Sequence, residues 1–172
     1  ASLTGHLVFS TLHTNDAPTA LTRLVDMGIE PYLVASSLEA VAAQRLVRVI
    51  CPHCKEQVTT SEAMVLRQRF GNKLPDVLYK GKGCKNCQET GYRGRIGIFE
   101  MMLVTDDIRS LIIENASARD LRRVAAKQGT TSLREDGFRH IHEGRTTVEE
   151  VLRVTKDDTF EESSFSDNTA KR

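Results

Sequence analysis

Two matched pairs of cysteines constrain this chain more than any other feature. They stand as CPHC, with Cys51 and Cys54, and as CKNC, with Cys84 and Cys87. Two C-x-x-C turns can bring four thiolates to one tetrahedral zinc ion, at about 2.3 Å for each Zn–S bond. Two disulfides fit poorly because no secretory signal is visible, and a redox C-x-x-C motif would occur singly. We therefore predict one structural zinc ion per chain.

The segment between the two pairs is longer than in common zinc ribbons, so it has room for a helix. The run SEAMVLRQRF predicts a helix over 61–70, with apolar Met64, Val65 and Phe70 around one side. His53 lies inside the first pair, but four cysteines already fill a tetrahedral site. We therefore expect His53 to be a solvated residue.

Composition excludes several classes of protein. The 172 residues are 40% hydrophobic and 27% charged, as in ordinary globular proteins. A net charge of +1 and the lack of tryptophan argue against nucleic acid or an anionic membrane as the main partner. No apolar run is long enough to span a bilayer. The sequence begins at Ala1 without a methionine, and we expect it to be a piece of a longer protein.

The N-terminal half alternates predicted strands and helices. The run LVFSTL predicts a short buried strand over 7–12, and helices are expected to begin at Pro18 and Pro31. The stripe of the second helix contains Leu33, Val34, Leu38, Val41 and Ala42. Further strands are expected over 45–50, leading into the first cysteine pair, and over 97–104. This alternation favours an open, parallel α/β sheet.

Three successive capping boxes predict helices in the C-terminal part. They begin at Ser117, Ser132 and Thr147 and follow a short helix over 106–114. The expected ranges are 118–127, 133–143 and 148–154. The apolar residues expected to pack together as a small bundle are Leu121, Val124, Ala125, Phe138, Ile141, Val148, Val151 and Leu152. The acidic, Ser/Thr-rich segment 157–172 is expected to be disordered.

Polar side chains follow the predicted strand over 7–12, where a parallel sheet binds its ligands. They are Ser10, Thr11, His13, Thr14 and Asn15, whose groups suit phosphate oxygens and the waters of a metal ion. On the residues alone, His13 is either a turn residue or a site residue, and His6 is either bonded to backbone or part of a site. The sequence has no G-x-x-x-x-G-K-[ST] motif, so the residues alone give half a site.

Three segments resemble a known family of motor proteins. TGHLVFSTLHTNDA is similar to the histidine box of the bacterial secretion ATPase superfamily. ALTRLVDMGIEPYLVASSLEAVAAQRLVRVICPHC and GYRGRIGIFEMM resemble segments of type II secretion ATPases and type IV pilus assembly ATPases. The resemblance runs from Ser2 to Lys156. Paired C-x-x-C motifs are typical of these two branches and absent from pilus retraction ATPases, so a retraction motor is not expected.

This resemblance implies an α/β fold: the C-terminal part of a RecA-like P-loop ATPase sheet, an inserted tetracysteine zinc subdomain and a C-terminal helical bundle. The expected divisions are 1–50 for the RecA-like part, 51–92 for the zinc subdomain, 93–156 for the strand and helical subdomain, and 157–172 for the tail. In the family, the Walker motifs precede the histidine box. ATP and Mg²⁺ would therefore be bound mainly by upstream residues, and this chain alone is expected to be inactive.

The family also implies roles for individual residues. His6 and His13 match the catalytic histidine-box pair, and His13 would sense the γ-phosphate or position the attacking water. Arg95 matches an arginine that approaches bound nucleotide, unless it is only an exposed loop residue; Arg93 and Thr11 are further cofactor-binding candidates. The four cysteines carry over as zinc ligands. For Gln44, Arg45 and Arg48 the resemblance gives no role.

At the level of the whole protein, the resemblance implies a hexameric ATPase on the cytoplasmic face of the bacterial inner membrane. It would power type II protein secretion by driving pseudopilus assembly through membrane platform proteins, with peripheral membrane association through those partners and no nucleic acid. A type IV pilus assembly ATPase is the alternative. An alternative of another class is a non-enzymatic zinc module that binds proteins.

Overall fold

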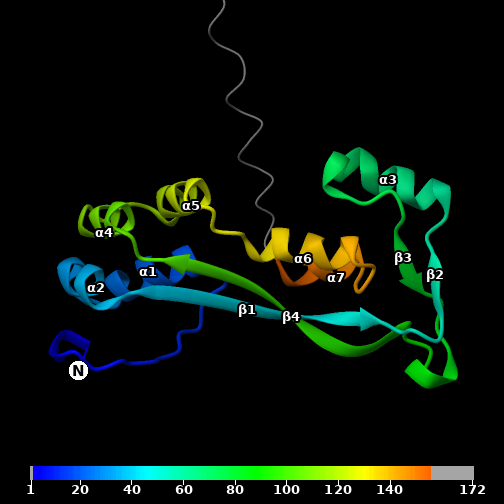
Figure 1. Cartoon of the computed structure of the whole chain (residues 1–172), viewed down its shortest axis with the longest axis horizontal. Coiled ribbons are helices and arrows are strands. Elements are labelled where there is room, and N and C mark those ends of the chain that lie inside the picture. Colours follow the sequence, from blue (N-terminus) through cyan, green and yellow to red (C-terminus); the bar gives the residue numbers. More distant parts are fainter. Residues whose placement is uncertain (1, 156–172) are drawn as a thin grey trace, which may run out of the picture.

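A long antiparallel pair of strands, β1 (Ala40–Ile50) and β4 (Tyr92–Leu103), forms the axis of the molecule in this computed structural model (Figure 1). The structure describes residues 2–155. Pairing runs from Ala40 opposite Leu103 to Ile50 opposite Tyr92, with one irregularity near Ile50. A second antiparallel pair, β2 (Lys55–Gln57) with β3 (Tyr79–Gly81), lies beyond one end of this axis.

Seven α-helices surround the strands in the described part of the chain. They are α1 (Ala17–Asp26), α2 (Pro31–Ser37), α3 (Thr60–Phe70), α4 (Asp106–Ile113), α5 (Ala118–Lys127), α6 (Leu133–His142) and α7 (Val148–Val154). Short 3-10 turns cover Ser2–Thr4, Gly71–Lys73 and Lys85–Cys87. In Figure 1, α1, α2, α4 and α5 lie at one end, α6 and α7 lie near the middle, and α3 lies at the other end.

Two apolar cores form along the β1–β4 pair. The first joins α1, α2, α4 and α5 to the end of β4, and its most buried members include Leu21, Met102, Ile108 and Leu121. The second joins α3, the segment after it, α6 and α7 to the middle of both strands; it contains Val47, Phe70, Leu78, Ile98, Phe138 and Val151. Each fully buried side chain of this size contributes about 1.5–3 kcal/mol. The strand pair therefore carries both cores.

The prediction of a buried parallel strand over 7–12 is wrong. Residues 6–14 adopt no regular secondary structure, and Leu7 and Phe9 are 83% and 88% exposed. The reason is that a strand needs a neighbour with which to exchange hydrogen bonds, and no described segment pairs with this one. Both described sheets are antiparallel, so the expected parallel order is not present among residues 2–155.

Two predictions about apolar stripes also fail. The second helix ends at Ser37, and Val41 and Ala42 lie in β1 opposite Met102 and Met101, because pairing with β4 replaces the helical pattern. In α3 the predicted helix is confirmed, but Met64 and Val65 are exposed.

The buried side of α3 carries Ala63 and Phe70, which lie seven positions apart on one helical face.

The C-terminal helices form where the capping residues predict, but they do not form one bundle. Ser117, Ser132 and Thr147 each accept a hydrogen bond from the backbone N–H three residues later. Leu121 of α5 packs in the first core, whereas Phe138 of α6 packs in the second. The two helices separate because α5 packs on α1 and α4, while α6 packs on β4 and α7. Residues 157–172 lie outside the described residues.

A buried glutamate ties helices from distant parts of the chain to β4. Glu100 is 5% exposed, and its two carboxylate oxygens accept from the N–H of Ala17 at 3.1 Å and the N–H of Leu133 at 3.3 Å. These are the first residues of α1 and α6, whose N–H groups have no partner within their own helix. Burial raises the pKa of the Glu100 carboxyl. One side chain thus fixes two helix starts.

A second buried glutamate ties α7 to the free edge of β1. Glu150 is 1% exposed and accepts from the backbone N–H of Arg48 at 3.1 Å, from the Arg48 guanidinium at 2.6 Å, and from Arg153 at 3.0 Å. Burial alone would raise the pKa of Glu150, but the hydrogen bonds from both guanidinium groups outweigh it and lower the pKa to about 2. The guanidinium carbon of Arg48 also lies 4.2 Å from the centre of the Tyr92 ring.

We expect Glu150→Gln to lower the free energy of unfolding at pH 7 by about 2 kcal/mol, because it weakens charge-assisted hydrogen bonds. The lowered pKa means that the charged carboxylate stabilises the fold at neutral pH. This contribution is lost as the pH falls from about 4.5 through about 2. Urea unfolding followed by circular dichroism at both ends of this window measures the effect.

The matched control for this prediction is Glu149→Gln, since Glu149 is the exposed neighbour of Glu150. Loss of any metal from the cysteines in acid affects all three proteins equally. The difference in stability between wild type and Glu150→Gln should therefore shrink towards pH 2, whereas an equal difference at every pH would contradict the role given to the charge.

Candidate functional site

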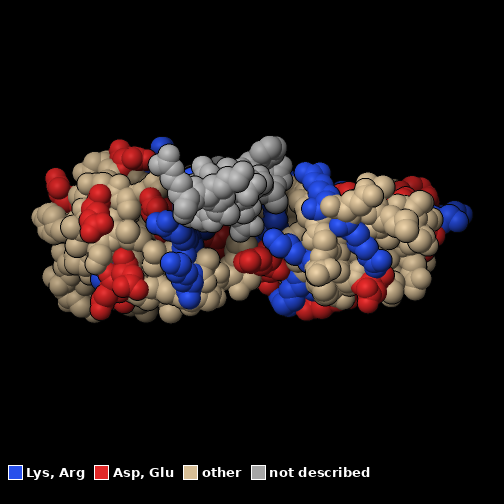
Figure 2. Space-filling view, turned by 90° about the horizontal axis from the view of Figure 1, so that it is seen from above, with Lys and Arg blue, Asp and Glu red and all other residues tan. Residues whose placement is uncertain are grey.

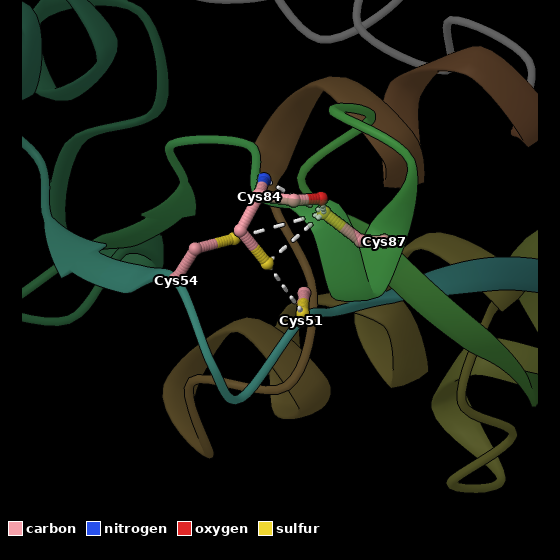
Figure 3. A group of neighbouring side chains, drawn as sticks. All are labelled: Cys51, Cys54, Cys84 and Cys87. Atoms are coloured by element: carbon pink, nitrogen blue, oxygen red, sulfur yellow. Dashed lines mark hydrogen bonds between the residues drawn. The ribbon is translucent and has the colours of Figure 1, made fainter.

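Four cysteine side chains point toward one another at the end of the β1–β4 pair (Figure 3). Cys51 directly follows β1, Cys54 directly precedes β2, and Cys84 and Cys87 come from the turn that leads into β4. Their Sγ atoms all lie within 4.8 Å of one another. The convergence predicted from the two C-x-x-C motifs is therefore present.

The spacing of the sulfur atoms fits a tetrahedral metal ion. The Sγ atoms of Cys51 and Cys84 lie 3.9 Å apart, those of Cys54 and Cys87 lie 3.9 Å apart, and those of Cys84 and Cys87 lie 3.7 Å apart. A tetrahedron with Zn–S bonds of about 2.3 Å has edges of about 3.8 Å. All four thiols are free, so the expectation that they form no disulfides agrees with the structure. That the cluster binds zinc stays a prediction.

Glycines let the backbone fold tightly around the cluster. Gly91 has a φ of +77°, and a Cβ placed there would come 2.5 Å from the carbonyl oxygen of Gly81. A side chain at Gly81 would in turn collide with the backbone of Gly91. The N–H of Gly91 is thereby brought to 3.3 Å from the Sγ of Cys87, to which it donates. These two positions therefore need glycine so that the strands around the cysteines can approach closely.

The thiols of the cluster have opposite tendencies to ionise. Burial would raise the pKa of Cys87, but N–H donors from Cys84 and Gly91, together with neighbouring thiols, lower it to about 6. For Cys54, burial and the adjacent thiols raise the pKa to about 12. Four thiolates in one cluster repel one another, so their joint ionisation needs a bound cation. His53 is exposed and does not belong to the cluster.

Three side chains of the N-terminal segment were predicted to face a nucleotide, and all three are exposed: His6, Thr11 and His13. His6 is exposed, and its Nδ1 lies 3.0 Å from the hydroxyl oxygen of Thr4. His13 and Thr11 are also exposed, within the irregular segment 6–14. No hydrogen bond joins His6 to His13 among the described residues. The assignment of these side chains to catalysis or cofactor binding stays a prediction.

The two arginines predicted to approach nucleotide lie on β4. Arg93 and Arg95 are both exposed, and Arg95 lies opposite Arg48 across the strand pair. Neither takes part in an ion pair within residues 2–155, so both guanidinium groups remain open to an anionic ligand. Their role also stays a prediction.

Two contacts of Arg45 were not foreseen from the sequence. Its Nη2 donates to the side-chain oxygen of Asn15 at 2.8 Å and approaches the carbonyl oxygen of Thr14 at 3.4 Å. The segment directly after His13 is thereby attached to β1. No local pattern could have revealed this, because the partners lie 30 residues apart.

The face drawn in Figure 2 carries charges of both signs. On the side drawn in Figure 2, Lys and Arg side chains are interspersed with Asp and Glu along the molecule. None of the described helices combines the length and apolar character needed to cross a membrane.

Comparison with known proteins gives a consistent set of relatives. A family model described as type II/IV secretion system protein matches residues 1–153. Type II secretion system protein E of Pseudomonas aeruginosa is 52% identical over 158 residues, which cover 92% of this chain and 31% of that protein. Type IV pilus assembly ATPase TfpB of Acinetobacter baylyi is 49% identical over 156 residues, which cover 90% of this chain and 27% of that protein. The resemblance inferred from the sequence motifs is confirmed.

A solved structure supports the fold. The crystal structure of the pilus retraction motor PilT with bound ADP matches with a TM-score of 0.57 and 22% identity, over 90% of this chain and 34% of that chain. At this identity the match shows only that the two chains share a fold. The chain spans less than a third of the length of the two curated relatives described above.

We expect elemental analysis to find one zinc ion per chain, and Cys51→Ser to lose it. Cys51 is fully buried, so the loss should also lower the melting temperature by several degrees, since metal binding and folding are coupled. Mass spectrometry under native conditions and a thermal melt, each with and without a chelator, provide the measurements.

His53→Ala is the matched control for the cysteine variant. His53 lies between Cys51 and Cys54 but is exposed and outside the cluster, so this variant should keep its zinc and its melting temperature. A Cys51→Ser protein that melts like wild type would show that the cluster does not stabilise the fold.

Proposed function

The chain belongs to the type II/IV secretion system protein family, and on that premise we propose that it is the C-terminal segment of an ATPase that powers type II protein secretion. The observation that carries the proposal is the 52% identity to a type II secretion system protein E over 92% of the chain. In this proposal, the full-length protein hydrolyses ATP as a hexamer on the cytoplasmic face of the bacterial inner membrane. It drives pseudopilus assembly through platform proteins in that membrane.

A type IV pilus assembly ATPase is the second candidate. It is supported by 49% identity to such a protein from Acinetobacter baylyi and 45% identity to another from Myxococcus xanthus. Both functions use the same reaction, and they differ in the fibre that is assembled. A non-enzymatic zinc module has less support, because relatives in both groups are named as ATPases.

His13 is proposed to position the attacking water or to sense the γ-phosphate of ATP bound by the rest of the full-length protein. Its support is chemical: an exposed imidazole can donate a hydrogen bond to a phosphate oxygen and release it when the phosphate leaves. Thr11 and His6 lie on the same exposed segment and are proposed as its helpers.

Arg95 and Arg93 are proposed to contact the nucleotide phosphates from β4. Guanidinium groups suit phosphate because they remain charged and donate in pairs. Both side chains are exposed and without an ion pair in the described part of the chain, which leaves their donors available.

The cysteine cluster is proposed to hold one zinc ion with a structural role. Its support is that the four sulfur atoms leave no open position for a substrate, as in other structural sites with four thiolates. Such an ion would hold the turn after β1 against the turn before β4. We further propose that residues 1–50, 51–92 and 93–156 form the RecA-like part, the zinc subdomain and the C-terminal subdomain.

We predict that His13→Ala lowers the rate of ATP hydrolysis by full-length protein about 100-fold or more, the range expected when a positioned proton-transfer group is lost. His6→Ala should have a much smaller effect, because His6 lies seven positions away and is bonded to Thr4. Steady-state phosphate release with Mg²⁺ is the measurement, and His53→Ala serves as the control.

Equal and slight effects of the two histidine variants would contradict the catalytic assignment. We also expect the 172-residue chain alone to show no ATP hydrolysis, since its sequence has no phosphate-binding G-x-x-x-x-G-K-[ST] motif. Magnesium-dependent turnover by the pure chain would overturn that expectation.

A further inference from the structure

We propose that Arg45 is a positioning residue for His13: it holds the loop directly after the histidine through Asn15 and thereby sets the place of the imidazole. This inference rests on the catalytic role proposed for His13. It assigns a function to an arginine for which the sequence motifs give none.

The support begins with an abrupt change in hydrogen bonding along the chain. From Leu7 to His13, the described structure contains no hydrogen bond from either backbone or side chain. From Thr14 to Ala17, every residue is tied to a distant part of the fold. Arg45 binds the first two, Arg122 binds Asp16 at 3.2 Å, and Glu100 accepts from Ala17. His13 is therefore the last residue without a described hydrogen bond before the bonded residues 14–17.

Arg45 is the anchor nearest to His13. Its Nη2 donates to Asn15 Oδ1 at 2.8 Å, a normal length for a charge-assisted bond, and also approaches the carbonyl oxygen of Thr14. The other two anchors act further along, at the start of α1. Only Arg45 therefore restrains the two residues that immediately follow the histidine.

The backbone of Arg45 belongs to a paired strand, which makes its side chain suitable for positioning the loop after His13. Its backbone lies in the centre of β1, opposite Ile98 of β4, and the next residue but one, Val47, is fully buried. The guanidinium group reaches a polar hollow that it lines together with Asn15, Arg153 and Thr155. A paired strand thus presents a planar donor to the loop that follows residues 7–13, which make no hydrogen bond in the described part of the chain.

Small displacements of a catalytic group have large effects on rate. A misplacement of about 1 Å can cost about 100-fold. Loss of the Arg45 bond would free Thr14 and Asn15 and widen the range of positions open to the His13 imidazole. Nucleotide affinity would change little, because Arg45 is not proposed to touch the nucleotide.

The test uses full-length protein and steady-state ATP hydrolysis. Arg45→Met keeps most of the side-chain stem but removes the donors, and it should lower kcat about tenfold or more while KM for ATP stays within about twofold. Asn15→Ala, which removes the exposed acceptor, should act in the same direction. Arg45→Lys keeps one charged donor and should recover part of the rate.

A second arm separates positioning from general stability. In a His13→Ala background, Arg45→Met should cause no further loss of kcat, because the group that it positions is already absent. Arg23→Met is the matched control, since Arg23 is exposed on α1 and its side chain takes part in no hydrogen bond or ion pair among residues 2–155. It should leave kcat and the melting temperature unchanged.

The outcomes distinguish this inference from the proposed function. If wild type does not hydrolyse ATP, or His13→Ala is without effect, the proposed role of His13 is wrong and this inference falls with it. If His13→Ala is slow but Arg45→Met retains its rate, only the positioning role is wrong. If Arg45→Met lowers kcat equally in the wild-type and His13→Ala backgrounds, the positioning role is also wrong. If Arg45→Met does not fold, the same comparison is made with Asn15→Ala.

Discussion

The pairing of β1 with β4 is the interaction on which the rest of the structure depends. The strand residues of the two cores, such as Ile98 in one and Met102 in the other, occupy alternate positions and therefore lie on one face of the pair, where the cores follow each other along its length. The same pair brings the two cysteine turns together, because Cys51 directly follows β1 and the CKNC turn leads into β4. Helices from both ends of the sequence pack on the surface that this strand pair provides.

Two buried glutamates show how the docking is made specific. Glu150 meets two guanidinium groups, and its pKa falls to about 2, so the interior holds a charged and fully bonded carboxylate. Glu100 meets mainly backbone N–H groups, and burial raises its pKa. The difference follows from the partners: a full positive charge offsets the cost of burial, whereas two helix-end dipoles offset only part of it. Glu100 connects the starts of α1 and α6 to β4, and Glu150 connects α7 to β1. These directed bonds fix positions that apolar packing alone specifies less well.

Local signals in the sequence predicted what depends on neighbouring residues. The C-x-x-C spacing predicted the cysteine cluster, and Ser117, Ser132 and Thr147 predicted three helix starts, since a cap needs only the next few residues. The strand over 7–12 was predicted wrongly because an apolar run does not reveal whether a pairing partner exists. The contacts of Glu100 and Arg45, and the contact of Glu150 with Arg48, span between 30 and 102 residues, and no short pattern encodes them.

The position of Arg45 also connects the two parts of the candidate site. Arg45 and Cys51 lie on or directly after the same strand, six positions apart, which corresponds to about 20 Å of extended chain. The cysteine cluster lies at one end of β1, and Glu150 binds the free edge of this strand at Arg48. Arg45 attaches the loop after His13 to the same strand. A metal ion bound by the four cysteines would therefore influence the geometry of the histidine segment, because the cluster and the segment are both attached to β1. Under the proposed function, this arrangement gives a physical reason for a tetracysteine site so near the histidine segment.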